Sequence, residues 1–190
     1  MKTNPLQNIA DTLLKMDKKA ALFLADQNYD EALNAYEEIL KAQEQLKLEK
    51  LCGQTLLNIA NIYIVRNDYD KALECINKAA LLKTMQPNNI DRGNLKLSYA
   101  NCLFRLGKAK EAESELKKEL MKSYSKTLCG KMELMLFSYY METNNKAAAR
   151  ACVDKAINHF KFDKNTNELL RALHARVDYF KSVGQEHYAR

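Results

Sequence analysis

The most constraining feature of this sequence is a series of alanines at nearly constant spacing. Ala32, Ala72, Ala112, Ala149 and Ala189 are separated by 40, 40, 37 and 40 residues. The first three stand in related phrases, NYDEAL at 28–33, DYDKAL at 68–73 and GKAKEA at 107–112. Such a period is typical of a repeated helix pair, because one pair alone cannot bury its apolar face and needs stacked neighbours. We therefore expect a repeat protein.

Composition favours an all-α fold. The 190 residues include only 5 glycines and 2 prolines, fewer than sheets and long loops need. Apolar residues recur every three or four positions in nearly every segment, which is the helical period. No apolar run reaches the roughly 18 residues that a membrane span requires.

The helical pattern divides the chain into repeats of one array. We expect a single array over residues 1–190, with repeats at about 5–48, 51–86, 93–124 and 127–161 and a partial fifth at 166–190. Gly53 is the only turn signal before the clear helix at 54–66, so we set a helix boundary there. Because Ala189 lies on the alanine series one residue before the chain stops, we expect either a fragment of a longer array or a final short helix that packs differently.

The residues around Ala72 match a known repeat. Large and small side chains alternate there: Leu56, Ile59, Ala60 and Tyr63, then Tyr69, Ala72, Ile76 and Ala79. This pattern resembles the tetratricopeptide repeat, in a form with a longer period, over essentially the whole chain. The resemblance implies a right-handed α-solenoid of stacked antiparallel helix hairpins, in which small residues let helix axes approach. Phe137 departs from it, because a small residue is expected there.

No feature of the sequence indicates catalysis. His159, His174 and His187 lack partners at metal-ligand spacing, and there is no phosphate-binding loop or nucleophile elbow. The 5 cysteines are far apart, which fits reduced thiols in a cytoplasmic protein. We expect a cytoplasmic protein that is not an enzyme and needs neither cofactor nor metal.

The resemblance also implies a binding surface. In this family the first helix of each repeat lines an inner groove that binds peptides. The matching residues here are Leu57, Asn58, Asn61, Ile64, Asn94, Leu97, Asn101, Phe104, Arg105, Lys131 and Leu134.

Asn61 and Asn101 lie 40 residues apart, so we expect them on neighbouring rungs of this groove. An asparagine offers both a donor and an acceptor to a peptide backbone, each bond contributing about 1 kcal/mol net. Flanking apolar residues such as Leu97 and Phe104 would contribute about 1.5–3 kcal/mol each when fully buried. The alternative is a groove filled by the protein itself.

Three functions follow as hypotheses. The leading one is a protein-interaction scaffold that holds a peptide or helix of a partner protein. The second is a self-associating scaffold fragment, a homo-oligomer that forms through the open array end. The third is a basic RNA-binding repeat, based on the net charge of +6 and on the lysines at 117, 118 and 122; nucleic acid is not the expected partner, because these lysines alternate with glutamates.

Overall fold

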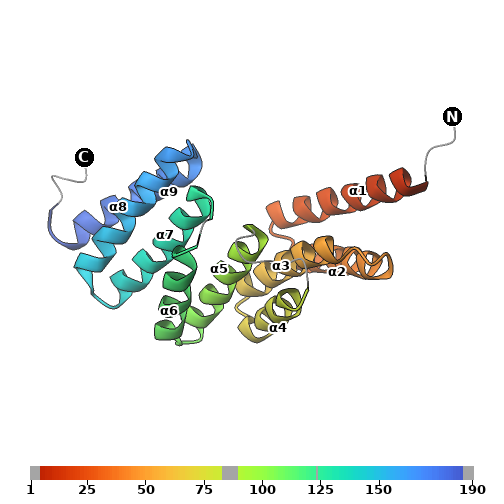
Figure 1. Ribbon diagram of the computed structural model, residues 1–190, viewed down its shortest axis with the longest axis horizontal. Helices are drawn as coiled ribbons and strands as arrows, with labels where there is room; N and C mark the ends of the chain where they lie inside the picture. The colour runs from red at the N-terminus through yellow and green to blue at the C-terminus, as the bar shows by residue number, and fades with distance from the viewer. Residues whose placement is uncertain (1–4, 83–89, 123, 186–190) are drawn as a thin grey trace. The chain divides into compact units, whose positions relative to one another are not determined.

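The computed structural model describes residues 5–82, 90–122 and 124–185. Within these ranges every regular element is a helix, which confirms the predicted all-α class (Figure 1). In chain order the helices are α1 (Pro5–Ala25), α2 (Tyr29–Gln45), α3 (Glu49–Val65), α4 (Tyr69–Ala80), α5 (Ile90–Arg105), α6 (Ala109–Leu120), α7 (Lys126–Glu142), α8 (Lys146–Phe162) and α9 (Thr166–Ser182).

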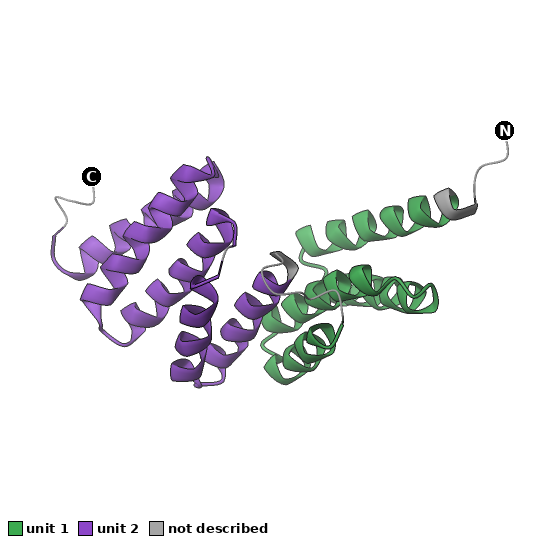
Figure 2. Ribbon diagram, viewed as in Figure 1, with its two compact units in different colours: residues 1–86 green, residues 87–190 purple. Residues whose placement is uncertain are grey.

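The chain forms two compact units, unit 1 (Met1–Gln86) and unit 2 (Pro87–Arg190) (Figure 2). In unit 1, α1 packs on α2, α2 on α3 and α3 on α4. In unit 2 each helix from α5 to α9 packs on the next, and α7 also contacts α5 and α9. Packing between chain neighbours is the arrangement of a helical-repeat solenoid. The continuous array over both units stays a prediction, and Ala189, which marks the partial fifth repeat, lies outside the described residues.

The alanines of the series are buried where helices pack together. Ala32, Ala72, Ala112 and Ala149 are each 0% exposed. They lie in the first turn of α2, α4, α6 and α8, where their small side chains allow close approach of a neighbouring helix. Three further alanines at a 40-residue interval are as deeply buried: Ala20, Ala60 and Ala100.

One predicted boundary is wrong. Gly53 does not precede a helix; it is buried inside α3, which begins at Glu49. The 37-residue step reflects helix and connection lengths together. Compared with α2, α6 is shorter (12 residues against 17), and the connection at 121–125 is only two residues longer than the one at 46–48, which leaves the step three residues short of 40.

Each unit has its own hydrophobic core. In unit 1, Tyr36, Ile39, Ile59 and Ile62 pack together with the small Ala20 and Ala32. In unit 2 the core includes the fully buried Met132 and Phe160. Phe137, the departure from the repeat pattern, is also part of that core. None of the helices in the described ranges combines the length and the apolar character needed to cross a membrane.

Candidate functional site

A groove of about 420 Å³ lies between three first helices of unit 2. Helices α5, α7 and α9 form its walls, and we call it the α5–α7–α9 groove. Its lining residues are Leu97, Asn101, Phe104, Arg105, Lys131, Leu134, Met135, Phe137, Ser138, Tyr139, Glu142, Glu168, Arg171 and Ala175.

The structure brings six of the predicted binding residues together in this groove. Helix α5 contributes Leu97, Asn101, Phe104 and Arg105, and helix α7 contributes Lys131 and Leu134. Their spacing of three, four or seven residues places each set on one face of its helix. Asn94, which also lies on α5, is half-buried and does not line the groove.

The other four predicted residues lie on α3 of unit 1. Leu57 is only 2% exposed, so in this structure its side chain offers almost no surface to a ligand. Asn58 and Ile64 are half-buried and Asn61 is exposed. Because Asn61 and Asn101 belong to different units, their pairing as neighbouring rungs stays a prediction.

The floor of the groove is aromatic and aliphatic. Phe104 and Tyr139 stack with ring centroids 5.2 Å apart and an interplanar angle of 29°. These rings, together with Leu97 and Leu134, are half-buried and pack against the core of unit 2. Aromatic pairs add about 0.5–1.5 kcal/mol to the effect of burial alone. The floor is therefore an apolar surface supported by the core of unit 2, and such pre-organisation lowers the entropic cost of binding.

The rim of the groove is charged. Glu168 Oε1 lies 3.4 Å from the Lys131 ammonium nitrogen, and Glu168 Oε2 lies 2.9 Å from Nη1 of Arg171. Both cations are thus already paired with this carboxylate. Arg105 is exposed and forms no ion pair within the described part of the chain. A ligand with a carboxylate would find its strongest unpaired counter-charge at Arg105.

A second polar network connects α7 to α6. Glu113 of α6 accepts a hydrogen bond from the Tyr140 hydroxyl and one from the Lys117 ammonium at 2.6 Å. The hydrogen bond from Lys117, and then the one from Tyr140, hold the pKa of Glu113 below its ordinary value of 4.5. Tyr140 stands beside Tyr139, with ring centroids 5.2 Å apart. This network therefore helps to position the aromatic floor.

The sequence-based list missed the whole of α9. Glu168, Arg171 and Ala175 line the groove but were not predicted. A signal was present, because the 40-residue period carries Lys131 onto Arg171 and Met135 onto Ala175. The predicted residues ended in the fourth repeat, so they did not include α9, the third wall of the groove.

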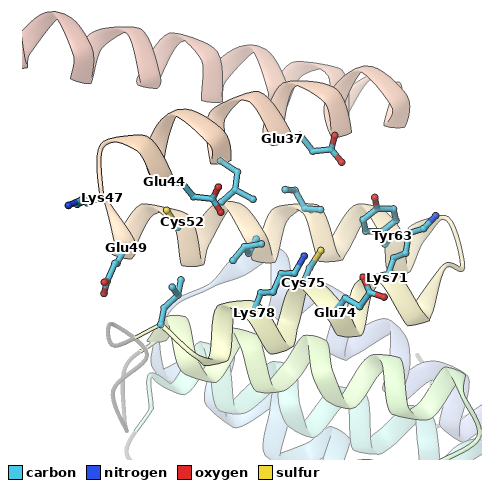
Figure 3. Close-up of a pocket in the computed structure, with 14 residues that line it drawn as sticks. Glu37, Glu44, Lys47, Glu49, Cys52, Tyr63, Lys71, Glu74, Cys75 and Lys78 are labelled. Atoms are coloured by element: carbon cyan, nitrogen blue, oxygen red, sulfur yellow. The ribbon is translucent and has the colours of Figure 1, made fainter.

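Unit 1 contains another groove that the sequence did not indicate. It measures about 550 Å³ and lies between α2, α3 and α4, whose side chains converge on it in Figure 3. Its floor includes Leu56, Ile59 and Tyr63, and its rim mixes glutamates with lysines. Burial raises the pKa of both thiols that line it, Cys52 and Cys75, so they stay protonated at neutral pH and are poor nucleophiles.

Across the described residues, no group of three or more histidine, cysteine, aspartate or glutamate side chains is placed to hold a metal ion. His187 lies outside the described residues.

Comparisons with known proteins place this geometry in context. No protein-family model matches the chain. Photosystem I assembly protein Ycf3 from Prochlorococcus marinus is 36% identical over 104 residues, which cover 48% of this chain and 57% of that protein. The match thus spans somewhat more than half the length of that relative.

A solved structure supports the fold independently. The crystal structure of BtubC (BKLC) from P. vanneervenii superposes with a TM-score of 0.73, covering 97% of this chain and 78% of that one. At 15% sequence identity, this likeness concerns the fold alone. With the buried alanine series and the sequential helix packing, it shows that the chain has a tetratricopeptide-like helical-repeat fold.

Proposed function

We propose that this protein is a non-enzymatic interaction scaffold that holds a peptide or helical segment of a partner protein in the α5–α7–α9 groove. One observation carries the proposal: six residues selected for peptide contact from the repeat pattern line one groove with an apolar floor and a charged rim. The similarity to a protein named for assembly of photosystem I supports a role in protein interaction.

The groove defines the chemistry of its ligand. Phe104, Tyr139 and Leu134 would pack against one or two large apolar side chains, each contributing about 1.5–3 kcal/mol when fully buried. Asn101 would bond the ligand backbone, and Arg105 would pair with a carboxylate. After the cost of association these contacts correspond to micromolar affinity, about −8 kcal/mol.

The test begins with a ligand selected from a random peptide library displayed on phage. We expect the selected peptides to share a large apolar residue and an acidic residue. Their affinity for the wild-type protein and for groove variants would then be measured by calorimetry.

Ser138→Tyr is the informative variant, because Ser138 is exposed, lines the groove and lies outside the core. The added ring should fill the groove and weaken binding at least about tenfold, a loss of about 1.4 kcal/mol. Ser114→Tyr on the exposed face of α6 is the matched control and should leave affinity unchanged. Equal affinities for the two variants would rule the α5–α7–α9 groove out as the binding site.

A further inference from the structure

A second groove of unit 2 lies between α6, α7 and α8 and measures about 840 Å³. We call it the α6–α7–α8 groove. Its lining residues are Lys117, Lys118, Leu120, Met121, Lys122, Tyr124, Lys126, Cys129, Glu133, Lys155 and His159. None of these residues lines the α5–α7–α9 groove.

The two grooves use opposite faces of the same helix. Cys129 and Glu133 of α7 line the α6–α7–α8 groove, whereas Lys131 and Met135 line the other. A helix turns about 100° per residue, so positions two apart point about 200° away from each other. The α6–α7–α8 groove is therefore separate from the α5–α7–α9 groove, and an occupant of one does not fill the other.

The charge of this groove favours an anionic occupant. Five of its lining residues are lysines and one is a carboxylate. Four of these lysines also contact a glutamate, namely Lys117, Lys118, Lys122 and Lys155. Burial, and next the charge of Lys126, lower the pKa of His159, so this histidine is neutral at neutral pH. The side chains of Lys118 and Lys155 are 67% and 62% exposed and remain accessible despite their contacts with glutamates. Lys126 forms no ion pair among the described residues.

The groove also has an apolar edge. Met121 is 88% exposed and follows the half-buried Leu120 at the end of α6. An exposed methionine offers a flexible, polarisable surface that adapts to aliphatic side chains. An occupant that matches the groove therefore combines negative charge with apolar side chains.

The exposed Met121 and the lack of an open aromatic surface favour a peptide over a nucleic acid in this groove. Glu133 is buried at the base, with Oε1 3.6 Å from the Lys155 ammonium. Its Oε2 atom has no hydrogen-bond partner within the described residues. This atom is closed to solvent, so Glu133 belongs to the wall of the groove and does not itself contact the occupant. Two aromatic side chains line the groove, Tyr124 and His159. Tyr124 donates a hydrogen bond to Glu119, and both rings are half-buried, so neither provides an open platform for stacked bases.

We propose that the α6–α7–α8 groove is a second binding site, which takes an acidic peptide segment carrying aliphatic side chains from a partner protein. Carboxylates of the segment pair with Lys118, Lys126 and Lys155, and an aliphatic side chain packs on Met121. This site does not depend on the α5–α7–α9 groove, and each of the two proposals can fail alone.

Three methionines allow one experiment to distinguish the sites. The methyl group of Met121 reports on the α6–α7–α8 groove, that of Met135 on the α5–α7–α9 groove, and that of the fully buried Met132 on the core. The full chain, labelled with ¹³C at its methionine methyl groups, would be titrated with a synthetic peptide of alternating Glu and Leu. Oligouridine RNA would be titrated in parallel.

A charge variant and its control are matched by position. The groove variant combines Lys126→Glu, in the first turn of α7, with Lys118→Gln, in the last turn of α6. The control variant combines Lys110→Glu, in the first turn of α6, with Lys161→Gln, in the last turn of α8. Both double variants remove the same charge at equivalent helix positions, where the helix dipole acts alike, but Lys110 and Lys161 lie outside the groove.

We expect the peptide to shift the Met121 resonance and to leave Met135 and Met132 unchanged. The groove variant should bind about tenfold more weakly and the control as tightly as the wild type. Raising the salt should weaken binding, because the lysines are exposed.

Four results would overturn the inference. They are an unmoved Met121 resonance, equal losses in both variants, a stronger response to RNA than to the peptide, and a Met121 shift that follows protein concentration without ligand, which would indicate a second copy. A shift of Met135 alone would reject this site while supporting the proposed function.

Discussion

Gly130 lies in the middle of α7, where the ring of Phe160 approaches the helix backbone. A Cβ atom at this position would lie 2.6 Å from Cε1 and 2.7 Å from Cζ of Phe160. Phe160 is fully buried, so its ring has little freedom to move away. The glycine therefore permits the close packing of α7 on α8.

Gly130→Ala is expected to destabilise the protein. Alanine gains about 1 kcal/mol in helix propensity, but overpacking a core typically costs about 1–3 kcal/mol. We expect a net loss of about 1 kcal/mol in the free energy of unfolding, measured by urea denaturation. Adding Phe160→Leu should recover part of the loss of Gly130→Ala in a double-mutant cycle. An alanine variant as stable as the wild type would show that the ring yields easily.

The glycines of the sequence carry a second periodic signal, which predicts close helix packing. Gly53, Gly93 and Gly130 are separated by 40 and 37 residues, the same steps as the alanines. All three are buried inside helices, and a Cβ at Gly93 would collide with Leu128. Gly53 was interpreted by its poor helix propensity, about 1 kcal/mol below alanine. At these positions tertiary packing outweighs that preference. A short stretch of sequence, considered alone, does not reveal such packing.

Glu113 is expected to make stability depend on pH in the acid range. Its pKa is lowered in the folded state by Lys117 and then by Tyr140. A carboxyl group with a lowered folded pKa contributes stability that is complete above its unfolded pKa and is lost as the pH falls through the folded value. The ordinary value is 4.5, so this contribution should disappear below it.

The measurement compares wild type with Glu113→Gln by urea denaturation across this range. At pH 7 the glutamine variant should be about 0.5–1 kcal/mol less stable, because the hydrogen bond from Lys117 loses its charged acceptor. The difference should shrink as the pH falls below 4.5. A difference that stays constant with pH would assign the effect to packing.

At the scale of elements, the three-residue turns between helices share one geometry. The second residue of each turn has a positive φ: Gln27, Lys47, Asn67, Gly107, Asn144, Lys164 and, after α9, Gly184. The next backbone N–H then bonds a carbonyl five residues earlier, as Asn165 does to Phe160 at 3.0 Å. This pattern is the Schellman ending of a helix, which favours glycine. Five of the turns place another residue type there.

Lys164→Gly is expected to stabilise unit 2. Lys164 has a φ of 53°, and a left-handed conformation costs a residue with a side chain about 1–2 kcal/mol. Glycine avoids this cost but loses more entropy on folding, so the net gain should be about 0.5–1 kcal/mol. Thermal denaturation measures it. Gly107→Ala, at a φ of 75°, is the reverse control and should lower the melting temperature; a lower value for Lys164→Gly would contradict the argument.

These turns explain which element boundaries could be predicted. The predicted helix at 54–66 ends before Asn67, a residue type that favours turns, and α3 does end there, at Val65. The turn between α2 and α3 has Lys47 at its left-handed position, and lysine is not a turn signal. The start of α3 was therefore predicted five residues too late. Helix type was predictable from periodicity, but this turn was set by tertiary packing.

At the scale of the whole molecule, the repeat period predicts which residues are equivalent but not every contact between them. Within unit 2, residues of α5 and α7 that the period makes equivalent line the same groove. Burial was harder to predict: Leu57 and Leu97 occupy equivalent positions, yet Leu57 is buried and Leu97 is half-buried in the groove. Side-chain exposure depends on every neighbouring helix, whereas the period describes one hairpin at a time.

The asparagine pair provides a test at this scale. If one peptide follows both rungs, Asn61→Ala and Asn101→Ala should each weaken binding about fivefold, the equivalent of about 1 kcal/mol per hydrogen bond. The double variant should bind still more weakly without unfolding, because both substitutions lie on helix faces where alanine is well tolerated. Calorimetry with a selected peptide gives the affinities, and circular dichroism checks the fold.

The matched control changes Asn77 and Asn158, which are exposed on the second helices α4 and α8, to alanine and should leave affinity unchanged. An unaltered affinity in the Asn61→Ala variant alone would confine the ligand to unit 2, since Asn101 lines the α5–α7–α9 groove and Asn61 belongs to unit 1. Unaltered affinity in the double variant would remove the asparagine rungs from the mechanism and leave binding to the apolar floor and Arg105. A longer peptide that regains sensitivity to Asn61→Ala would instead show that the ligand reaches across the repeats of both units.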